Sequence, residues 1–121
     1  MSLDAAARRR YARQLLLGEI GEAGQEHLLD TRFRRGEASD ADAFAVAADY
    51  LSRAGCSHDA DGTELGVPGT DSVRRFAGSD ALLAPAAAVI GAFCAVEELK
   101  ATLGVGAARD FPPGLRLTPE S

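Results

Sequence analysis

The two cysteines, Cys56 and Cys94, are the residues best suited by type to covalent chemistry. A thiol attacks only as the thiolate, so its surroundings decide whether it can react. Cys94 lies in the middle of an apolar stretch, which is typical of an inert core residue. Cys56 lies beside an acid-rich loop, where negative charge raises the pKa of a thiol. We therefore expect neither cysteine to be a nucleophile.

The same residues give no indication of a metal site. The cysteines form no C-x-x-C pair, and His27 and His58 have no ligand spacing with either of them. Two free thiols far apart in the sequence are typical of a cytoplasmic protein. We expect a cytoplasmic chain that holds no metal and no cofactor of its own.

Acidic and basic side chains are the remaining candidates for binding charged ligands. Asp59 lies in an acid-rich segment, and Asp71 lies at the start of a short predicted helix. By residue type alone, the first is part of a solvated turn and the second is a helix N-cap. Four arginines crowd the predicted first helix, where a solvated face is the default: Arg8, Arg9, Arg10 and Arg13.

Residues 10–29 carry the most specific pattern of the chain, R-Y-A-R-Q-L-L-L-G-E-I-G-E-A-G-Q-E-H-L-L. This pattern resembles the opening signature of the ThiF/MoeB/HesA family of ubiquitin-activating-like adenylyltransferases, R-Y-x-R-Q-x-L-L-x-E-I-G-x-x-G-Q-x-x-L-L. In that family the second arginine reaches the ATP phosphates held by the partner subunit. The resemblance implies this catalytic role for Arg13, for which a guanidinium is well suited. From residue type alone, Arg13 is equally a surface residue paired with a local acid.

Further segments are similar to the family in the same order. Residues 84–100 resemble its late helix, A-P-x-x-x-V-I-G followed by A-x-E-x-L-K, which packs in the core and near the dimer interface. Asp59 lies in a segment similar to D-x-D-x-V-E, whose first acid binds the nucleotide ribose. Asp71 lies in a segment similar to G-T-D-N, whose acid helps to hold Mg²⁺. The resemblance thus implies a cofactor-binding role for Asp59 and a catalytic role for Asp71.

The family's phosphate-binding loop, G-x-G-G-x-G, is missing where the resemblance would place it. Residues 33–42 contain one glycine, Gly36, and three acids, Glu37, Asp40 and Asp42. Glycines let the backbone approach phosphates at a helix N-terminus, and acids in that place repel them. The charged run of residues 32–35 is also unsuited to a central parallel strand buried on both faces, so we expect this strand to be lost.

Apolar periodicity and caps predict about five helices. We expect residues 56–69 to be a loop and another helix to cross at Gly91, where a glycine inside a helix is otherwise unfavourable. The predicted helices run from Ser2 to near Gly18, from Glu22 to Leu29, between the caps Ser39 and Gly55, from Thr70 or Asp71 to about Phe76, and from Pro85 to Gly104. The predicted apolar stripes are Phe44, Ala47, Ala48 and Leu51 in the third helix, and Ala92, Val96, Leu99 and Leu103 in the fifth.

With 121 residues, the chain is expected to form a single domain. Its predicted parts are a helical hairpin (2–29), a degenerate nucleotide-loop region (30–80), a long core helix (85–104) and a loose tail (105–121). The fold class is mainly α, a reduced remnant of the ThiF-like α/β fold with most or all of the Rossmann sheet lost. The net charge of −5 argues against nucleic-acid and anionic-membrane surfaces. The longest uncharged run, residues 81–96, is shorter than the roughly 20 residues of a membrane span.

An intact Arg13 signature beside a degenerate phosphate loop favours a non-catalytic ThiF/MoeB-like protein. Its expected partners are a second copy or a full-length ThiF-like subunit, to which Arg13 is offered. One alternative is an adenylyltransferase that uses ATP and magnesium to activate a ubiquitin-like sulfur-carrier protein. Another is a small helical protein with an unrelated interaction function.

Overall fold

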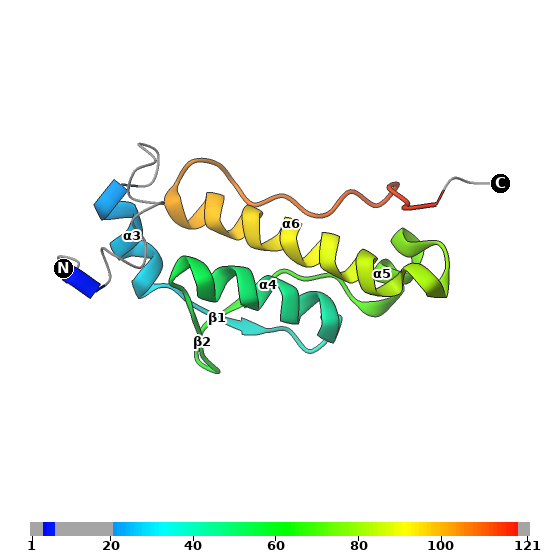
Figure 1. Cartoon of the computed structure of the whole chain (residues 1–121), viewed down its shortest axis with the longest axis horizontal. Coiled ribbons are helices and arrows are strands. Elements are labelled where there is room, and N and C mark those ends of the chain that lie inside the picture. Colours follow the sequence, from blue (N-terminus) through cyan, green and yellow to red (C-terminus); the bar gives the residue numbers. More distant parts are fainter. Residues whose placement is uncertain (1–3, 7–20, 119–121) are drawn as a thin grey trace.

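The computed structural model of the chain describes residues 4–6 and 21–118 (Figure 1). The predicted first helix, and Arg13 with it, lies almost wholly outside the described residues. The rest is mainly helical with a small sheet, as predicted, because most of its residues lie in helices. The elements in order are α3 (Gly21–Asp30), β1 (Arg32–Arg35), α4 (Ala41–Ala54), β2 (Ser57–His58), β3 (Thr63–Leu65), α5 (Thr70–Ala77), the 3-10 turn η1 (Asp80–Leu82) and α6 (Leu83–Leu103).

The sheet has three parallel strands in the order β2-β1-β3. β1 is therefore central, and Phe33 pairs with His58 on one side and with Thr63 on the other. Two predictions are wrong here: residues 32–35 do form a central parallel strand, and residues 56–69 contain two short strands rather than loop alone.

The outward face of β1 explains how this strand tolerates its arginines. Phe33 is buried and lies against Phe44 of α4, with the ring centroids 6.1 Å apart. The side chains of Arg32 and Arg34, which alternate with it, are 66% and 42% exposed. A strand with only one buried face needs an apolar residue on that face alone.

α4 and α6 lie side by side and form the centre of the core (Figure 1). At their crossing, a Cβ atom added to Gly91 would lie 2.5 Å from the carbonyl oxygen of Ala43 and 2.7 Å from Cβ of Val46. The prediction that another helix crosses at Gly91 is confirmed. The missing side chain lets the two backbones approach closely.

The predicted apolar stripe of the last helix is buried only in part, because Leu99 and Leu103 pack against the core but Val96 does not. The buried apolar face of α6 includes Ile90, Gly91 and Cys94, whereas Val96 is 55% exposed. α6 also begins at Leu83, so Pro85 is its third residue and not its first. By length and composition the stretch Asp80–Leu103 could cross a membrane, a test that core helices of soluble proteins also pass.

The helix ends agree with the sequence in part. Gly55 and Gly104 end α4 and α6 with left-handed backbone conformations, as expected of terminal glycines. The N-cap of α4, however, is Asp40 and not Ser39. After α6, residues 105–118 form no helix or strand and turn back alongside α6 towards α5 (Figure 1).

Candidate functional site

The three strands end at one edge of the sheet, which is where proteins with parallel sheets usually bind ligands. β1 leads through residues 36–40 into α4, Asp59 directly follows β2, and β3 leads into the loop before α5. Asp59 and Asp71 therefore follow strands that lie on opposite sides of β1. The structure brings these two predicted site residues to the same edge, while Arg13 lies outside the described residues.

The N-terminus of α4 is the anion-binding position of this edge, since a helix start offers N–H groups and a partial positive charge. The carboxylate of Asp40 already occupies it. This carboxylate accepts hydrogen bonds from the Ala43 N–H and from the Thr70 hydroxyl, each at 2.9 Å. The Asp40 N–H donates to the Pro68 carbonyl at 2.8 Å, and the residue is buried. The anion at this helix is thus part of the chain itself.

A second carboxylate lies over the single glycine of the loop. A Cβ atom added to Gly36 would lie 2.7 Å from Oε1 of Glu64, so the Glu64 side chain lies directly over this glycine. Glu64 also pairs with Arg34 at 3.7 Å. Arg35 donates from Nη2 to the Ser39 carbonyl at 2.7 Å and holds the loop closed on itself. The charged and hydrogen-bonding groups at this loop therefore find partners within the chain.

Asp59, for which the resemblance implies ribose binding, directly follows β2. Its side chain is engaged, with an ion pair to Arg32 at 3.5 Å and a hydrogen bond accepted from the Asp61 N–H at 2.8 Å. Its N–H donates to the Phe33 carbonyl at 2.9 Å and extends the pairing of the strands. These contacts account for an acid at this position without a ligand.

Asp71 is exposed in the first turn of α5. The prediction that it is the N-cap is wrong, because Gly69 holds that position and makes no side-chain cap. The hydrogen bond between Thr70 and Asp40 ties the start of α5 to the start of α4. Among residues 4–6 and 21–118, no three His, Cys, Asp or Glu side chains are arranged to hold a metal ion.

Both cysteines are buried and free of disulfides. Burial, with a smaller contribution from Glu98, raises the pKa of Cys56 from 9.0 to about 11. Burial, followed by Asp110 and Glu97, does the same for Cys94. The predicted direction for Cys56 is confirmed, but its main cause is burial and not the acids of the neighbouring loop. Neither thiol is a thiolate near neutral pH.

Gln25, part of the specific N-terminal pattern, has a structural position that the sequence did not indicate. Its side chain is fully buried, and Nε2 donates to the Ala54 carbonyl at 2.7 Å, so it ties α3 to the last turn of α4. Its Oε1 atom has no hydrogen-bond partner among the residues that the structure describes.

An apolar groove between α4 and α6 is the largest of the cavities that we describe, at about 690 Å³. Val96 and Tyr50, both exposed, stand beside the small side chains of Ala92 and Ala95. The sequence contained the signal for this groove, because the stripe assigned to the core includes three of its residues. We call it the α4–α6 groove, lined by Tyr50, Arg53, Ala54, Ala92, Ala95, Val96 and Leu99.

No family model, no curated protein and no solved structure matches this chain. The resemblance to the ThiF/MoeB/HesA family stays a prediction from the residues quoted above.

Proposed function

We propose that the chain is a non-catalytic relative of the ThiF/MoeB/HesA adenylyltransferases that works by pairing with another subunit. The observation that carries this proposal is the Asp40 carboxylate at the N-terminus of α4, hydrogen-bonded to Ala43 and Thr70. In an adenylyltransferase, the phosphates of ATP need this position. The partner is a second copy or a full-length ThiF-like subunit.

The balance of charge supports a site closed to nucleotide. Two unit charges about 4 Å apart interact by roughly 4 kcal/mol at an effective dielectric constant near 20, and a helix terminus attracts an anion by only about 0.3–1 kcal/mol. A triphosphate near Gly36 would meet both Asp40 and Glu64. Arg34 is already paired with Glu64 of β3, and Arg35 is bonded to the Ser39 carbonyl, so the two arginines offset little of this repulsion.

The α4–α6 groove supports pairing with a second copy. Its floor is formed by Ala92 and Ala95, and Tyr50 stands exposed beside them. Across a two-fold axis, each Tyr50 ring can fill the hollow over the alanines of the other copy, because the same patch meets itself. Arg53, paired with Asp49, places charge on the α4 side of the groove, as is usual at an interface rim.

Calorimetric titration of the full chain with Mg-ATP tests the non-catalytic part. We expect no heat of binding at ligand concentrations up to about 1 mM. Binding tighter than about 100 μM that disappears in Asp71→Ala, but persists in the matched variant Asp80→Ala, would establish the adenylyltransferase alternative instead. Asp80 suits the comparison because it is also an exposed acid at the start of a helical turn.

Sedimentation velocity tests the pairing. We expect the wild-type chain to form a dimer and Val96→Glu to be a monomer, because a charge in the apolar groove would have to be desolvated. Val105→Glu is the matched control, since Val105 is 60% exposed and lies outside the groove. Equal association of the two variants would rule out the groove as the interface.

The heterodimeric form of the proposal has its own test. We expect the chain to co-purify with a full-length ThiF-like enzyme and Arg13→Ala to lower the activity of that enzyme while leaving the complex intact. Loss of the complex through Val96→Glu, but not through Val105→Glu, would place the full-length partner on the α4–α6 groove. If neither the homodimer nor the complex with the full-length enzyme forms, the proposed pairing function is wrong.

A further inference from the structure

The C-terminal end of α5 is completed by residues from the tail of the chain. The Leu117 N–H donates to the Phe76 carbonyl at 2.7 Å, and Arg116 Nη1 donates to the Arg75 carbonyl at 2.9 Å. The last carbonyls of a helix have no partner within the helix itself. The tail therefore supplies two of the hydrogen bonds that this end of α5 requires.

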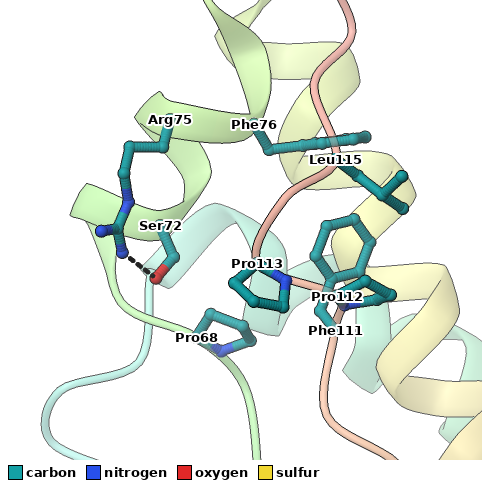
Figure 2. A pocket seen from close by; sticks show the side chains of 8 residues that line it. All are labelled: Pro68, Ser72, Arg75, Phe76, Phe111, Pro112, Pro113 and Leu115. Atoms are coloured by element: carbon teal, nitrogen blue, oxygen red, sulfur yellow. Dashed lines mark hydrogen bonds between the residues drawn. The ribbon is translucent and has the colours of Figure 1, made fainter.

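One aromatic side chain of the tail joins α5 to α6. Phe111 packs edge-on against Phe76 of α5, with ring centroids 4.8 Å apart, and against Phe93 of α6, with centroids 5.3 Å apart. Figure 2 shows Phe111 and Phe76 at a cavity of about 70 Å³ that Pro68 and Ser72 also line. The ring thus lies beside α5 and beside the loop that precedes it, and aromatic pairs of this geometry add to the stability gained by burial.

The rest of the tail follows the surface of α5. The chain turns at residues 113–114 and bends at residues 117–118, where the Thr118 side chain occupies the space that a Cβ atom of Gly78 would need. Gly78 ends α5 in a left-handed conformation. By contrast, residues 104–110, which join the tail to α6, are all exposed. A solvated connection lets the contacts of residues 111–118, which we call the tail segment, form and break apart from the core.

The opposite end of α5 is tied to the start of α4. The Thr70 hydroxyl donates to the Asp40 carboxylate at 2.9 Å, and the Asp40 N–H donates to the Pro68 carbonyl at 2.8 Å. Both partners of Asp40 belong to α5 or to the loop that leads into it. α5 has only eight residues, and a helix this short is marginal unless other parts of the molecule hold it. The contacts of Thr70 and Pro68 with Asp40 therefore depend on α5 staying in place.

We propose that α5 and the tail segment form one opening unit, so that the tail controls whether the polar site around Asp40 is complete. When the unit opens, Asp40 loses Thr70 and Pro68 but keeps the hydrogen bond from the Ala43 N–H, which belongs to α4. Release of the tail thus reaches the sheet edge through α5, while the crossing of α4 and α6 at Gly91 stays formed. This inference does not depend on the proposed pairing through the α4–α6 groove.

Native-state hydrogen exchange of the full chain, followed by NMR, tests the opening unit. The Asp40 N–H reports the start of α4, the Gly78 N–H reports the end of α5, and the Ile90 N–H reports the interior of α6. Phe111→Ala removes both ring contacts of the tail. We expect exchange at Asp40 and at Gly78 to become at least about tenfold faster, and exchange at Ile90 to stay within about twofold of the wild-type rate.

Two further variants keep the test decisive. Leu117→Pro removes the N–H that donates to Phe76, so it should accelerate exchange at the same two sites. Leu115→Ala is the matched control, because Leu115 lies in the tail segment but is 53% exposed, and it should change these rates by less than about threefold.

Three results would each overturn the proposal. Unchanged exchange at Gly78 in Phe111→Ala would mean that the tail does not hold α5. Acceleration at Gly78 without acceleration at Asp40 would mean that the two ends of α5 are not coupled. Equal acceleration at Ile90 would mean that α5 and the tail segment open only when the whole chain unfolds.

Discussion

The two ends of α4 show how differently one helix can meet its surroundings. At its start, the carboxylate of Asp40 and the loop around Gly36 satisfy one another, and Glu64 covers the glycine. Over its last two turns, Tyr50 and Arg53 line an apolar groove that is open to water. Exposed apolar surface favours association, whereas a polar site whose groups are already hydrogen-bonded gains little from a ligand. The difference supports the groove, rather than the sheet edge, as the interface that we propose.

The largest expected effect comes from the crossing that fixes the groove. Gly91→Ala should lower the free energy of unfolding by about 2–3 kcal/mol, because the added Cβ would press on the Ala43 carbonyl and on Val46. Urea denaturation measures the loss. Gly66→Ala is the matched control, since a Cβ there meets nothing within 4 Å, and it should change stability by less than about 1 kcal/mol. A harmless Gly91→Ala would mean that α4 and α6 are not held at a fixed distance.

Removing the N-cap residue of α4 tests the polar site at the start of this helix. Asp40→Ala should cost about 2 kcal/mol, because α4 loses its N-cap and the Thr70 hydroxyl loses a charged acceptor. Asp42→Ala removes an exposed acid from the same turn and should cost no more than about 0.5 kcal/mol. Similar losses in the two variants, measured by thermal or urea unfolding, would show that Asp40 is not the anion that closes this helix.

The sheet edge also shows what the sequence could not predict. The run of residues 32–35 reads as too charged for a central strand, because a parallel sheet normally has helices on both faces. Here one face carries Phe33 and the other is solvated, so Arg32 and Arg34 are tolerated in ion pairs with Asp59 and Glu64. The alternation was visible in the sequence, but the number of covering layers is a tertiary property that no local pattern contains.

α6 illustrates the opposite limit. Its position, its closing Gly104 and the close crossing at Gly91 were predictable, because each depends on a local backbone requirement. Its buried face was not, because the part of the helix before Glu97 is apolar around its whole circumference and periodicity cannot choose a side. Val96 was assigned to the core for this reason and proves to be exposed. The groove is the direct consequence of that surplus of apolar residues.

The pH dependence of stability tests whether the two buried thiols are shielded from water. Unfolded thiols ionise from pH 9.0, whereas Cys56 and Cys94 in the folded chain ionise only near 11. Between these values the unfolded state binds fewer protons, so stability present at pH 8 is lost as the pH rises through 11. The loss at pH 10 should be about 1 kcal/mol for each thiol. The double variant Cys56→Ala, Cys94→Ala should lack this part of the slope, and an unchanged slope would show that the thiols are solvated.

The smallest expected effect concerns the rim of the groove. Arg53 and Asp49 form an exposed ion pair at 3.2 Å, so Arg53→Ala and Asp49→Ala should each lower the free energy of unfolding by less than about 0.5 kcal/mol. Both variants remove the same pair, but only Arg53 lines the groove. If both losses of stability are this small, neither variant disturbs the fold. A difference in their degree of association, measured by sedimentation velocity, then reports the contribution of the Arg53 side chain to the interface. A loss above about 1 kcal/mol in Arg53→Ala alone would mean that the rim supports the fold, and the contrast between a closed end and an open face of α4 would no longer hold.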